Sequence, residues 1–328
     1  KLEVIKKATY VIFDKTGTLT KGTPEVTDVI ATKGITEKEL LELAASIEKG
    51  SEHSLAEAIV KRAEEEKLTL RKAETFQAIA GQGVFGVIDK KKIFFGNKHL
   101  MDRANISIGQ TQKTIEKLET EGKTVMMLAL DGKLTGLIAV ADTLKDSAQA
   151  GVMALEELGI EVAMITGDNK RTADAIAKQV GIKRVLAEVL PDQKEAEVRK
   201  IQAEGKKVAM VGDGINDAPA LAAADVGVAM GTGTDVAIEA SDITLVNKDL
   251  RSVASAITLS KKTMRTIRLN LFWAFGYNII LIPVAMGILY PFFNILLNPI
   301  FASLAMALSS ISVVTNSLLL KRLKLTYA

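Results

Sequence analysis

YVIFDKTGTLT, residues 10–20, carries the strongest signal of the fold. Four apolar residues end at Asp14 and lead into a turn with Gly17, which is typical of a buried strand with an active loop at its carboxyl end. The pattern returns at 162–165, before Thr166-Gly167-Asp168, and at 208–211, before Gly212-Asp213-Gly214. Helical patterns lie between these strands. The alternation predicts an α/β domain, a mostly parallel sheet with helices on both faces, whose three loops share one edge.

Residues from about 28 to 140 interrupt this alternation. Helical periodicity at 37–48 and 54–66 precedes two hairpin patterns, in which Asp89-Lys90 and Asp131-Gly132 separate apolar runs. We therefore predict an α+β domain at residues 28–140, inserted into a parallel-sheet domain made of residues 1–27 and 141–262.

Composition excludes several classes of protein. The formal net charge of the 328 residues is +3, which is too small to indicate nucleic acid as a partner. Cysteine is absent, so this chain has no disulfide framework, thiolate metal site or cysteine nucleophile. Because Lys1 is not a start methionine and no signal peptide precedes it, we expect the chain to begin inside a larger protein.

A membrane hairpin is predicted for residues 263–328. From Leu269 to Leu320, 52 consecutive residues include no Asp, Glu, Lys, Arg or His. A membrane helix needs about 20 apolar residues, so the run fits two spans, at about 269–290 and 298–320. Lysines and arginines flank the run on both sides, which predicts that both ends are cytoplasmic. The alternative is a buried helical hairpin of a soluble core, where so long an uncharged run is rare.

Asp14 has the chemistry of a phosphoryl acceptor. An aspartate on a strand-end loop can attack phosphorus and form an acyl phosphate, provided that nearby cations neutralise the charge. Asp213 and Asp217 offer carboxylate oxygens to Mg²⁺, and Lys194 can face the phosphoryl group. Thr166 and the Gly167 N–H can donate hydrogen bonds to the same group. Asp168 has two interpretations, a phosphate contact or the N-cap of a helix that begins near Lys170.

Three motifs in order resemble those of P-type ATPases, members of the haloacid-dehalogenase-like superfamily: DKTGTLT at 14–20, TGDN at 166–169 and GDGINDAPAL at 212–221. Lys194 matches the superfamily lysine. The resemblance implies these catalytic residues: Asp14, Lys15, Thr16, Thr166, Gly167, Asp168, Lys194 and Asn216. It implies these Mg²⁺-binding residues: Asp14, Thr16, Asp213 and Asp217. Superfamily phosphatases commonly have an aspartate where this chain has Thr16, so we expect an aspartyl phosphate that persists for lack of a local base.

The predicted insert resembles the nucleotide-binding domain of heavy-metal (type IB) P-type ATPases. Its SEHSL at 51–55 is similar to the family's SEHPL, with Ser54 in place of the proline. The resemblance implies that these residues surround the adenine of ATP: Glu48, His53, Gly81, Gly83, Gly96 and Asn97. Taken alone, His53 is more often an ordinary residue at the start of a helix.

Polar residues in the two predicted spans resemble those of copper(I)-exporting type IB pumps. In that family the matching residues contribute to sites for transported Cu(I): Tyr277, Asn278, Met306 and Ser310. Met306 and Ser310 are four residues apart, hence on one helix face, and a thioether suits the soft Cu(I) ion. The alternative is that Met306 fills a packing gap and the serines allow close helix approach.

The resemblance as a whole implies an ATP-driven Cu(I) export pump of which this chain is the catalytic and C-terminal membrane part. It also implies these partners: membrane lipid, an upstream actuator domain with the remaining transmembrane helices, and a cytosolic copper donor. We expect the plasma membrane of a prokaryote, with the catalytic domains in the cytoplasm. The alternatives are an Ag(I) pump, a membrane-anchored phosphohydrolase without transport, and a nucleotide-binding regulatory module.

Overall fold

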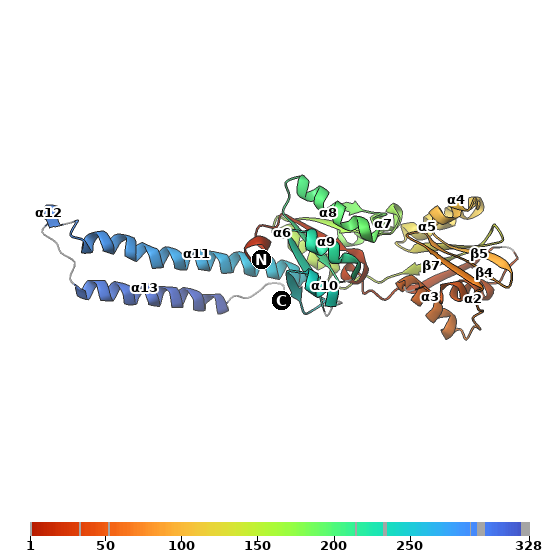
Figure 1. The fold of residues 1–328 in the computed structure, drawn as a ribbon, viewed down its shortest axis with the longest axis horizontal. Helices are drawn as coiled ribbons and strands as arrows, with labels where there is room; N and C mark the ends of the chain where they lie inside the picture. Colours follow the sequence, from red (N-terminus) through yellow and green to blue (C-terminus); the bar gives the residue numbers. More distant parts are fainter. Residues whose placement is uncertain are drawn as a thin grey trace. The chain divides into compact units, whose positions relative to one another are not determined.

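The computed structural model describes residues 2–32, 34–51, 53–213, 215–231, 235–288, 290–293 and 299–322. It divides into two compact units, Ala8–Arg251 and the combination of Lys1–Lys7 with Ser252–Ala328. The first unit contains both β-sheets, and the second contains the short helix α1 (Leu2–Ile5) and the long C-terminal helices (Figure 1).

A six-stranded parallel sheet has the order β12-β11-β10-β1-β8-β9, which confirms the predicted fold class. Its strands are β1 (Tyr10–Asp14), β8 (Glu161–Ile165), β9 (Arg184–Leu186), β10 (Val208–Gly212), β11 (Val226–Met230) and β12 (Ile243–Leu245). Asp14 lies beside Ile165 of β8, and Phe13 beside Val211 of β10. The loops that follow β1, β8 and β10 therefore meet at one edge of the sheet.

Both faces of β1 are covered, because every residue of the strand is buried. Tyr10 and Ile12 pack in one cluster with Val198 and Ile201 of α8 and with Leu221 of α9. The helices of this region are α6 (Ala148–Glu157), α7 (Lys170–Val180), α8 (Lys194–Ala203), α9 (Ala218–Ala223) and α10 (Asp235–Ala240).

A six-stranded antiparallel sheet, with the order β2-β7-β6-β5-β4-β3, forms the insert. Its strands are β2 (Glu25–Ala31), β3 (Thr75–Ile79), β4 (Gly83–Ile88), β5 (Lys91–Gly96), β6 (Thr124–Leu130) and β7 (Lys133–Ala141). Asp89 and Lys90 both have positive φ, as do Asp131 and Gly132, which is the backbone form of a tight two-residue hairpin. The two predicted hairpins are thereby confirmed.

Two pairs of helices sandwich this second sheet. α2 (Glu37–Glu48) and α3 (Ser54–Glu65) bury Leu40, Ile47 and Ile59 against one face. α4 (Lys98–Arg103) and α5 (Gln112–Thr120) bury Leu100 and Leu118 against the other. An apolar layer on each face accounts for the strong burial of β6, which lies in the middle of the sheet.

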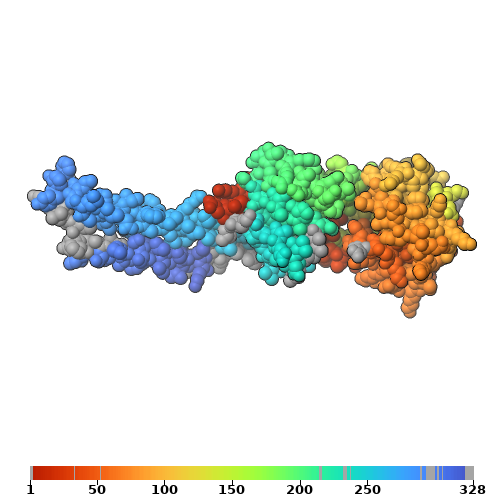
Figure 2. Space-filling model, viewed as in Figure 1, coloured from red at the N-terminus to blue at the C-terminus, as the bar shows by residue number. Residues whose placement is uncertain are grey.

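The C-terminal unit is dominated by α11 (Arg251–Ala285) and α13 (Pro299–Leu319), with the short α12 (Tyr290–Phe293) between them. Among the described residues, α11 is the helix with the length and apolarity to cross a membrane, and α13 offers a shorter apolar stretch, Met306–Leu319. Large apolar side chains are exposed along both helices. Figure 2 shows the surfaces of these two helices in shades of blue. The second predicted span begins at residue 298, which is outside the described residues, and it stays a prediction.

Polar side chains join α11 and α13 at the end of the hairpin nearest to Arg268 and Lys321. The Asn316 amide donates to Asn270 Oδ1 at 2.6 Å, and the Asn270 amide donates to Ser317 Oγ at 2.9 Å. Side-chain hydrogen bonds between apolar helices satisfy groups that would otherwise be unpaired.

Candidate active site

Asp14 and Lys194 form the centre of the site at the carboxyl edge of the parallel sheet. The Lys194 ammonium donates to Asp14 Oδ1 and to Asp217 Oδ1, each at 2.7 Å. All three side chains are buried. The fold brings them together because β1 carries Asp14, α8 begins with Lys194, and Asp217 follows β10, the neighbour of β1.

This centre has two carboxyl groups, Asp14 and Asp217, for one ammonium group, Lys194. Burial, with Asp217 next, raises the pKa of Asp14 to about 7, although Lys194 opposes the shift. Burial alone would lower the pKa of Lys194, but the Asp14 and Asp217 carboxylates raise it above its ordinary value. Lys194 is therefore a firmly charged cation between two carboxylates.

Asp213 adds a third carboxylate against the loop that follows Asp14. A Cβ on Gly17 would lie 2.0 Å from Asp213 Oδ2, so a larger residue would displace this carboxylate, and the φ of 74° favours glycine. Burial, with Asp217 next, raises the pKa of Asp213. The described residues hold no ready cluster of three or more His, Cys, Asp or Glu for a metal ion. Because Mg²⁺ binds through one or two carboxylates and keeps its waters, the crowded carboxylates still fit this ion.

Lys15 pairs with Asp168 on the other side of Asp14. The Lys15 ammonium lies 2.6 Å from Asp168 Oδ2, and Thr166 Oγ1 donates to the same oxygen at 3.0 Å. Burial alone would raise the pKa of Asp168, but Lys15 lowers it below its ordinary value. The structure thus brings together Asp14, Lys15, Thr166, Asp168, Lys194 and Asp217, whereas Thr16, Gly167 and Asn216 are exposed around them.

The cap of α7 is Asn169, so the N-cap interpretation of Asp168 is wrong. Asn169 Oδ1 accepts from the Thr172 N–H at 3.0 Å. Asp168 is held away from that role by its ion pair with Lys15. Sequence reasoning could not choose between neighbouring Asp and Asn residues, because both side chains cap helices well.

The predicted glycines of the nucleotide site meet in space. Gly83 pairs with Gly96 across β4 and β5, and a Cβ on Gly83 would lie 2.2 Å from the Phe95 carbonyl oxygen. The Asn97 amide donates to the Gly81 carbonyl oxygen at 2.8 Å. These glycines, which are separate in sequence, therefore pack backbone against backbone. There is no room for a side chain at Gly83 or Gly96.

His53 is the N-cap of α3, which agrees with its interpretation as an ordinary residue at the start of a helix. The cap uses one ring nitrogen. Nδ1 accepts from the Leu55 N–H at 3.2 Å. Although the His53 side chain is exposed, partial desolvation, with Lys15 next, lowers its pKa. Because Nδ1 accepts the hydrogen bond from Leu55, the ring proton lies on Nε2, which is a hydrogen-bond donor suited to a ligand.

Glu48 is buried at the end of α2. One of its carboxyl oxygens, Oε2, has no hydrogen-bond partner among the described residues. Burial raises the pKa of Glu48 to about 7. A buried polar atom without a partner is costly, and a water, ion or ligand group can satisfy it.

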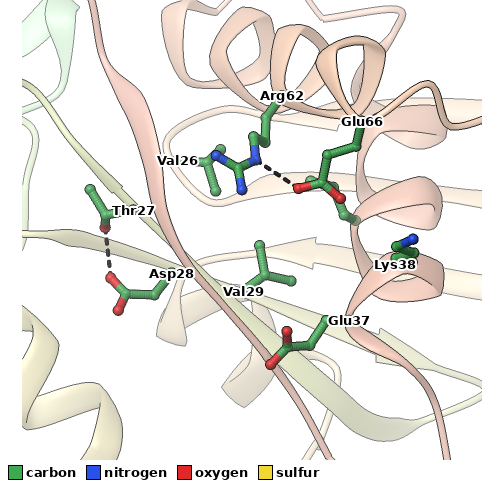
Figure 3. A pocket seen from close by; sticks show the side chains of 9 residues that line it. Val26, Thr27, Asp28, Val29, Glu37, Lys38, Arg62 and Glu66 are labelled. Carbon is green, nitrogen blue, oxygen red and sulfur yellow. Dashed lines mark hydrogen bonds and ion pairs between the residues drawn. The ribbon is translucent and has the colours of Figure 1, made fainter.

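Two cavities open in the insert. One, of about 220 Å³, lies between β2 and the α2 and α3 helices, where Arg62 pairs with Glu66 (Figure 3). It contains none of the predicted site residues. The other, of about 230 Å³, is lined by Glu48 and Ser51 together with residues of α3. The buried Glu48 therefore borders a cavity on the α2–α3 side of the insert.

The four residues predicted to bind transported Cu(I) lie on α11 and α13. Met306 is 69% exposed, and Ser310 Oγ donates to the Met306 carbonyl oxygen at 3.2 Å, one turn away. The Tyr277 ring stacks on Trp273, and the Asn278 amide donates to the Ala274 carbonyl oxygen at 2.8 Å. The described hydrogen bonds between the two helices involve other residues: Thr266, Asn270, Asn316 and Ser317.

Several residues near the site were not predicted from the sequence. Lys145 donates to the Gly17 carbonyl oxygen at 2.5 Å. Asp142 accepts from the Thr20 hydroxyl at 2.6 Å. Thr124, from the insert, donates to Asp168 at 2.9 Å. The sequence feature that could have indicated Asp142 and Lys145 is their position where the chain returns from the insert to the parallel sheet.

Comparison with known proteins agrees with this geometry. The family model for haloacid dehalogenase-like hydrolases matches residues 9–225, and a second such model matches residues 195–257. The chain therefore belongs to the haloacid dehalogenase-like hydrolases.

Relatives and solved structures indicate which group of haloacid dehalogenase-like hydrolases the chain resembles. The chain is 55% identical over 321 residues to a probable copper-exporting P-type ATPase of Archaeoglobus fulgidus, covering 98% of this chain and 39% of that protein. It is 49% identical over 324 residues to a copper-exporting P-type ATPase of Bacillus subtilis, with coverage of 98% and 39%. The chain thus spans about two fifths of the length of these relatives.

Two groups of solved structures resemble the fold. A zinc-transporting PIB-type ATPase in the E2·Pi state is 37% identical with a TM-score of 0.68, covering 97% of this chain and 51% of that one. The catalytic domain of the CPx-ATPase CopB-B is 31% identical with a TM-score of 0.61, covering 78% of this chain and 90% of that one. Within its family, the chain is one of the P-type ATPases. Membership, together with the apolar helix α11, makes it part of an integral membrane protein.

Proposed function

We propose that this chain is the catalytic and C-terminal membrane part of an ATP-driven Cu(I) exporter that works through an aspartyl phosphate at Asp14. The observation that carries the proposal is the buried contact of Lys194 with both Asp14 and Asp217 at the carboxyl end of β1. A cation that already touches the carboxylate is positioned to neutralise an incoming phosphoryl group.

In the proposed reaction, a carboxylate oxygen of Asp14 attacks the γ-phosphorus of ATP. A bond forms between that oxygen and phosphorus, and the bond from phosphorus to the β–γ bridging oxygen breaks, so that ADP leaves with the electron pair. Lys194 offsets the negative charge, and Thr166 with the Gly167 N–H donates hydrogen bonds to the transferred group. Lys15 is held next to Asp14 by Asp168.

Magnesium fits the same site. We propose that Asp14, Thr16, Asp213 and Asp217 hold the ion, which supplies charge neutralisation when it is bound. Asn216, exposed beside Asp217, belongs to the same catalytic group in this proposal. The support is the crowding of carboxylates, of which Asp14 and Asp217 are buried and Asp213 is half-buried. Burial and Asp217 raise the pKa values of Asp14 and Asp213.

We propose that the insert, residues 28–140, binds the adenine of ATP, and that residues 1–27 with 141–262 form the phosphorylation domain. Glu48, His53 and the close-packed backbone of Gly81, Gly83 and Gly96 are the proposed contacts, with Asn97 holding Gly81. The unpartnered Glu48 oxygen and the neutral Nε2 of His53 support this assignment.

Copper is the proposed cargo. The two relatives that are 55% and 49% identical to this chain over the aligned residues are described as copper exporters, whereas the zinc-transporting structure is 37% identical. Tyr277, Asn278, Met306 and Ser310 are the proposed ligands, and the thioether of Met306 matches the softness of Cu(I). The proposed partners are membrane lipid, the actuator domain and remaining helices of the same pump, and a cytosolic copper donor, in a prokaryotic plasma membrane.

The test is phosphorylation of the intact pump with radiolabelled ATP and Mg²⁺. We expect an acid-stable, hydroxylamine-labile label that disappears in Asp14→Asn, because the amide keeps the shape but cannot act as the nucleophile. Asp213→Ala should also suppress labelling, and added Mg²⁺ should restore it poorly. Asp146→Asn, an exposed change outside the site, should label like the parent. Persistent labelling of Asp14→Asn would refute the proposal.

A further inference from the structure

The insert reaches the catalytic loop with a buried carboxylate. Glu119 of α5 uses both of its oxygens on the start of α7: Oε1 accepts from the Asn169 amide at 3.0 Å, and Oε2 pairs with Arg171 at 2.5 Å. The Glu119 side chain is 11% exposed. Asn169 is also the cap of α7 and the residue that ends the TGDN motif. One side chain of the insert therefore fixes the end of a catalytic loop.

A second contact lies one strand further along. Thr124, the first residue of β6, donates to Asp168 Oδ1 at 2.9 Å. The other oxygen of this carboxylate, Oδ2, is the one that pairs with Lys15. Next to Thr124, the Lys123 carbonyl oxygen accepts from the Thr172 hydroxyl at 2.9 Å. The insert thus holds Asp168 on one side while Lys15 holds it on the other.

These contacts form a continuous path from the insert to the nucleophile. It runs from Glu119 and Thr124 through Asn169 and Asp168 to Lys15, which directly follows Asp14 in the chain. Because Glu119 and Thr124 belong to the insert, the path is complete only when the insert lies against this loop. A misplacement of about 1 Å at a catalytic group can slow a reaction by about 100-fold, so such contacts can control the rate.

We propose that Glu119 and Thr124 are positioning residues for phosphoryl transfer from ATP, which fix Asp168 and thereby Lys15 when the nucleotide-carrying insert closes. This inference rests on the proposed function. In this inference the insert has two roles: it delivers ATP, and it completes the catalytic loop. Phosphorylation of Asp14 by inorganic phosphate, which needs no nucleotide, does not depend on these two side chains.

The test compares two reactions of the intact pump in the variants Thr124→Val and Glu119→Gln, which keep the side-chain shapes. With saturating ATP, the single-turnover rate of Asp14 phosphorylation should fall by about 5- to 10-fold in each variant, the scale of one or two lost hydrogen bonds. The level of phosphoenzyme formed from inorganic phosphate should stay within about twofold of the parent. Thr124→Ser restores the hydroxyl and should recover most of the rate.

Matched controls lie on the same helix and its turn. Thr120→Val removes a hydroxyl whose hydrogen bond, within the part of the chain that the structure describes, goes to Glu116 of the same helix, and Glu121→Gln removes an exposed charge that pairs with Lys123. Both should match the parent in both reactions. An unchanged rate from ATP in Thr124→Val and Glu119→Gln would overturn the inference, as would equal losses from ATP and phosphate, which would indicate a purely structural role. A parent protein that takes no label from ATP would instead refute the proposed function.

Discussion

A buried carboxyl group decides how the insert responds to pH. Glu48 loses most of its hydration at the end of α2, and Ser51 compensates only in part, so its pKa rises from 4.5 to about 7. Near neutral pH the group therefore holds its proton for much of the time. A neutral carboxyl offers both a donor and an acceptor, which is the pattern that an adenine edge can pair with.

We predict that Glu48→Gln stabilises the protein at alkaline pH and not at acid pH. Between about pH 4.5 and 7 the folded chain binds a proton that the unfolded chain has released, so stability falls as pH rises through this window. The amide has no such penalty, and the gain should reach about 2–3 kcal/mol at about pH 8 and vanish near pH 4. Chemical unfolding at both pH values measures it.

Glu57→Gln, an exposed change on α3, controls for the loss of one negative charge. Because the amide introduced by Glu48→Gln keeps a donor and an acceptor, ATP affinity should change by less than about 1 kcal/mol. The same gain in stability at both pH values would contradict the account of Glu48 titration.

At the scale of single elements, α13 combines an apolar surface with a few polar groups. Met306 is exposed, and Ser310, one turn later, satisfies its hydroxyl on the Met306 carbonyl oxygen. Asn316, further along the helix, is instead used to join α13 to α11 through Asn270. The helix therefore separates groups that stabilise the hairpin from groups that are open to a ligand.

We predict that Met306→Leu in the intact pump lowers Cu(I)-stimulated ATPase activity and bound Cu(I), with ATP binding unchanged. Leucine keeps the volume and apolarity of methionine, and such swaps usually cost less than about 1.5 kcal/mol of stability. It lacks the soft sulfur that suits Cu(I). Activity and metal content of the purified pump measure the effect.

Leu308→Met, two residues along the same helix, adds a sulfur away from the proposed ligands and should leave both quantities unchanged. If Met306→Leu retains the Cu(I) stimulation of the parent, Met306 serves only in packing and the copper assignment loses its support within this chain.

At the scale of the whole sheet-containing unit, two connections join the parallel sheet to the insert, and one carboxylate ties them together. Asp142, after β7, accepts from the Thr20 hydroxyl at 2.6 Å and from the Gly22 and Thr23 N–H groups at 3.1 and 3.3 Å. Lys145 holds the Gly17 carbonyl oxygen of the same loop. The point where the chain leaves the parallel sheet is thus fastened to the point where it returns.

We predict that Asp142→Ala destabilises the protein by about 2–3 kcal/mol, since it leaves several donors without their charged acceptor. Asp142→Asn should have a smaller effect, because its amide oxygen can still accept one or two of these bonds. Thermal unfolding measures both. Asp146→Asn, exposed four residues later, should change stability by less than about 0.5 kcal/mol. A cost for Asp142→Ala no larger than that of Asp146→Asn would contradict the proposed fastening.

The amino-acid sequence alone was enough to predict the parallel sheet, the α+β insert with its two hairpins, and the meeting of three Asp-bearing loops at one edge of the sheet. Periodicity and turn residues act over a few neighbours, so they are legible without the fold. The carboxyl ends of β1, β8 and β10 had to meet at one edge once the strands were parallel and adjacent. The family resemblance supplied the P-type ATPase class from three ordered motifs, and the comparisons confirm it.

Which side chains touch became apparent only in the folded chain. Lys194 bridging Asp14 and Asp217, Asp168 pairing with Lys15, and Glu119 reaching across from the insert all join residues far apart in the chain. Such contacts depend on how helices and strands pack, and the local pattern of a segment carries no information about its distant partner. The same physical reason explains why Asn270 and Asn316 could be seen as polar residues in an apolar run but not as partners.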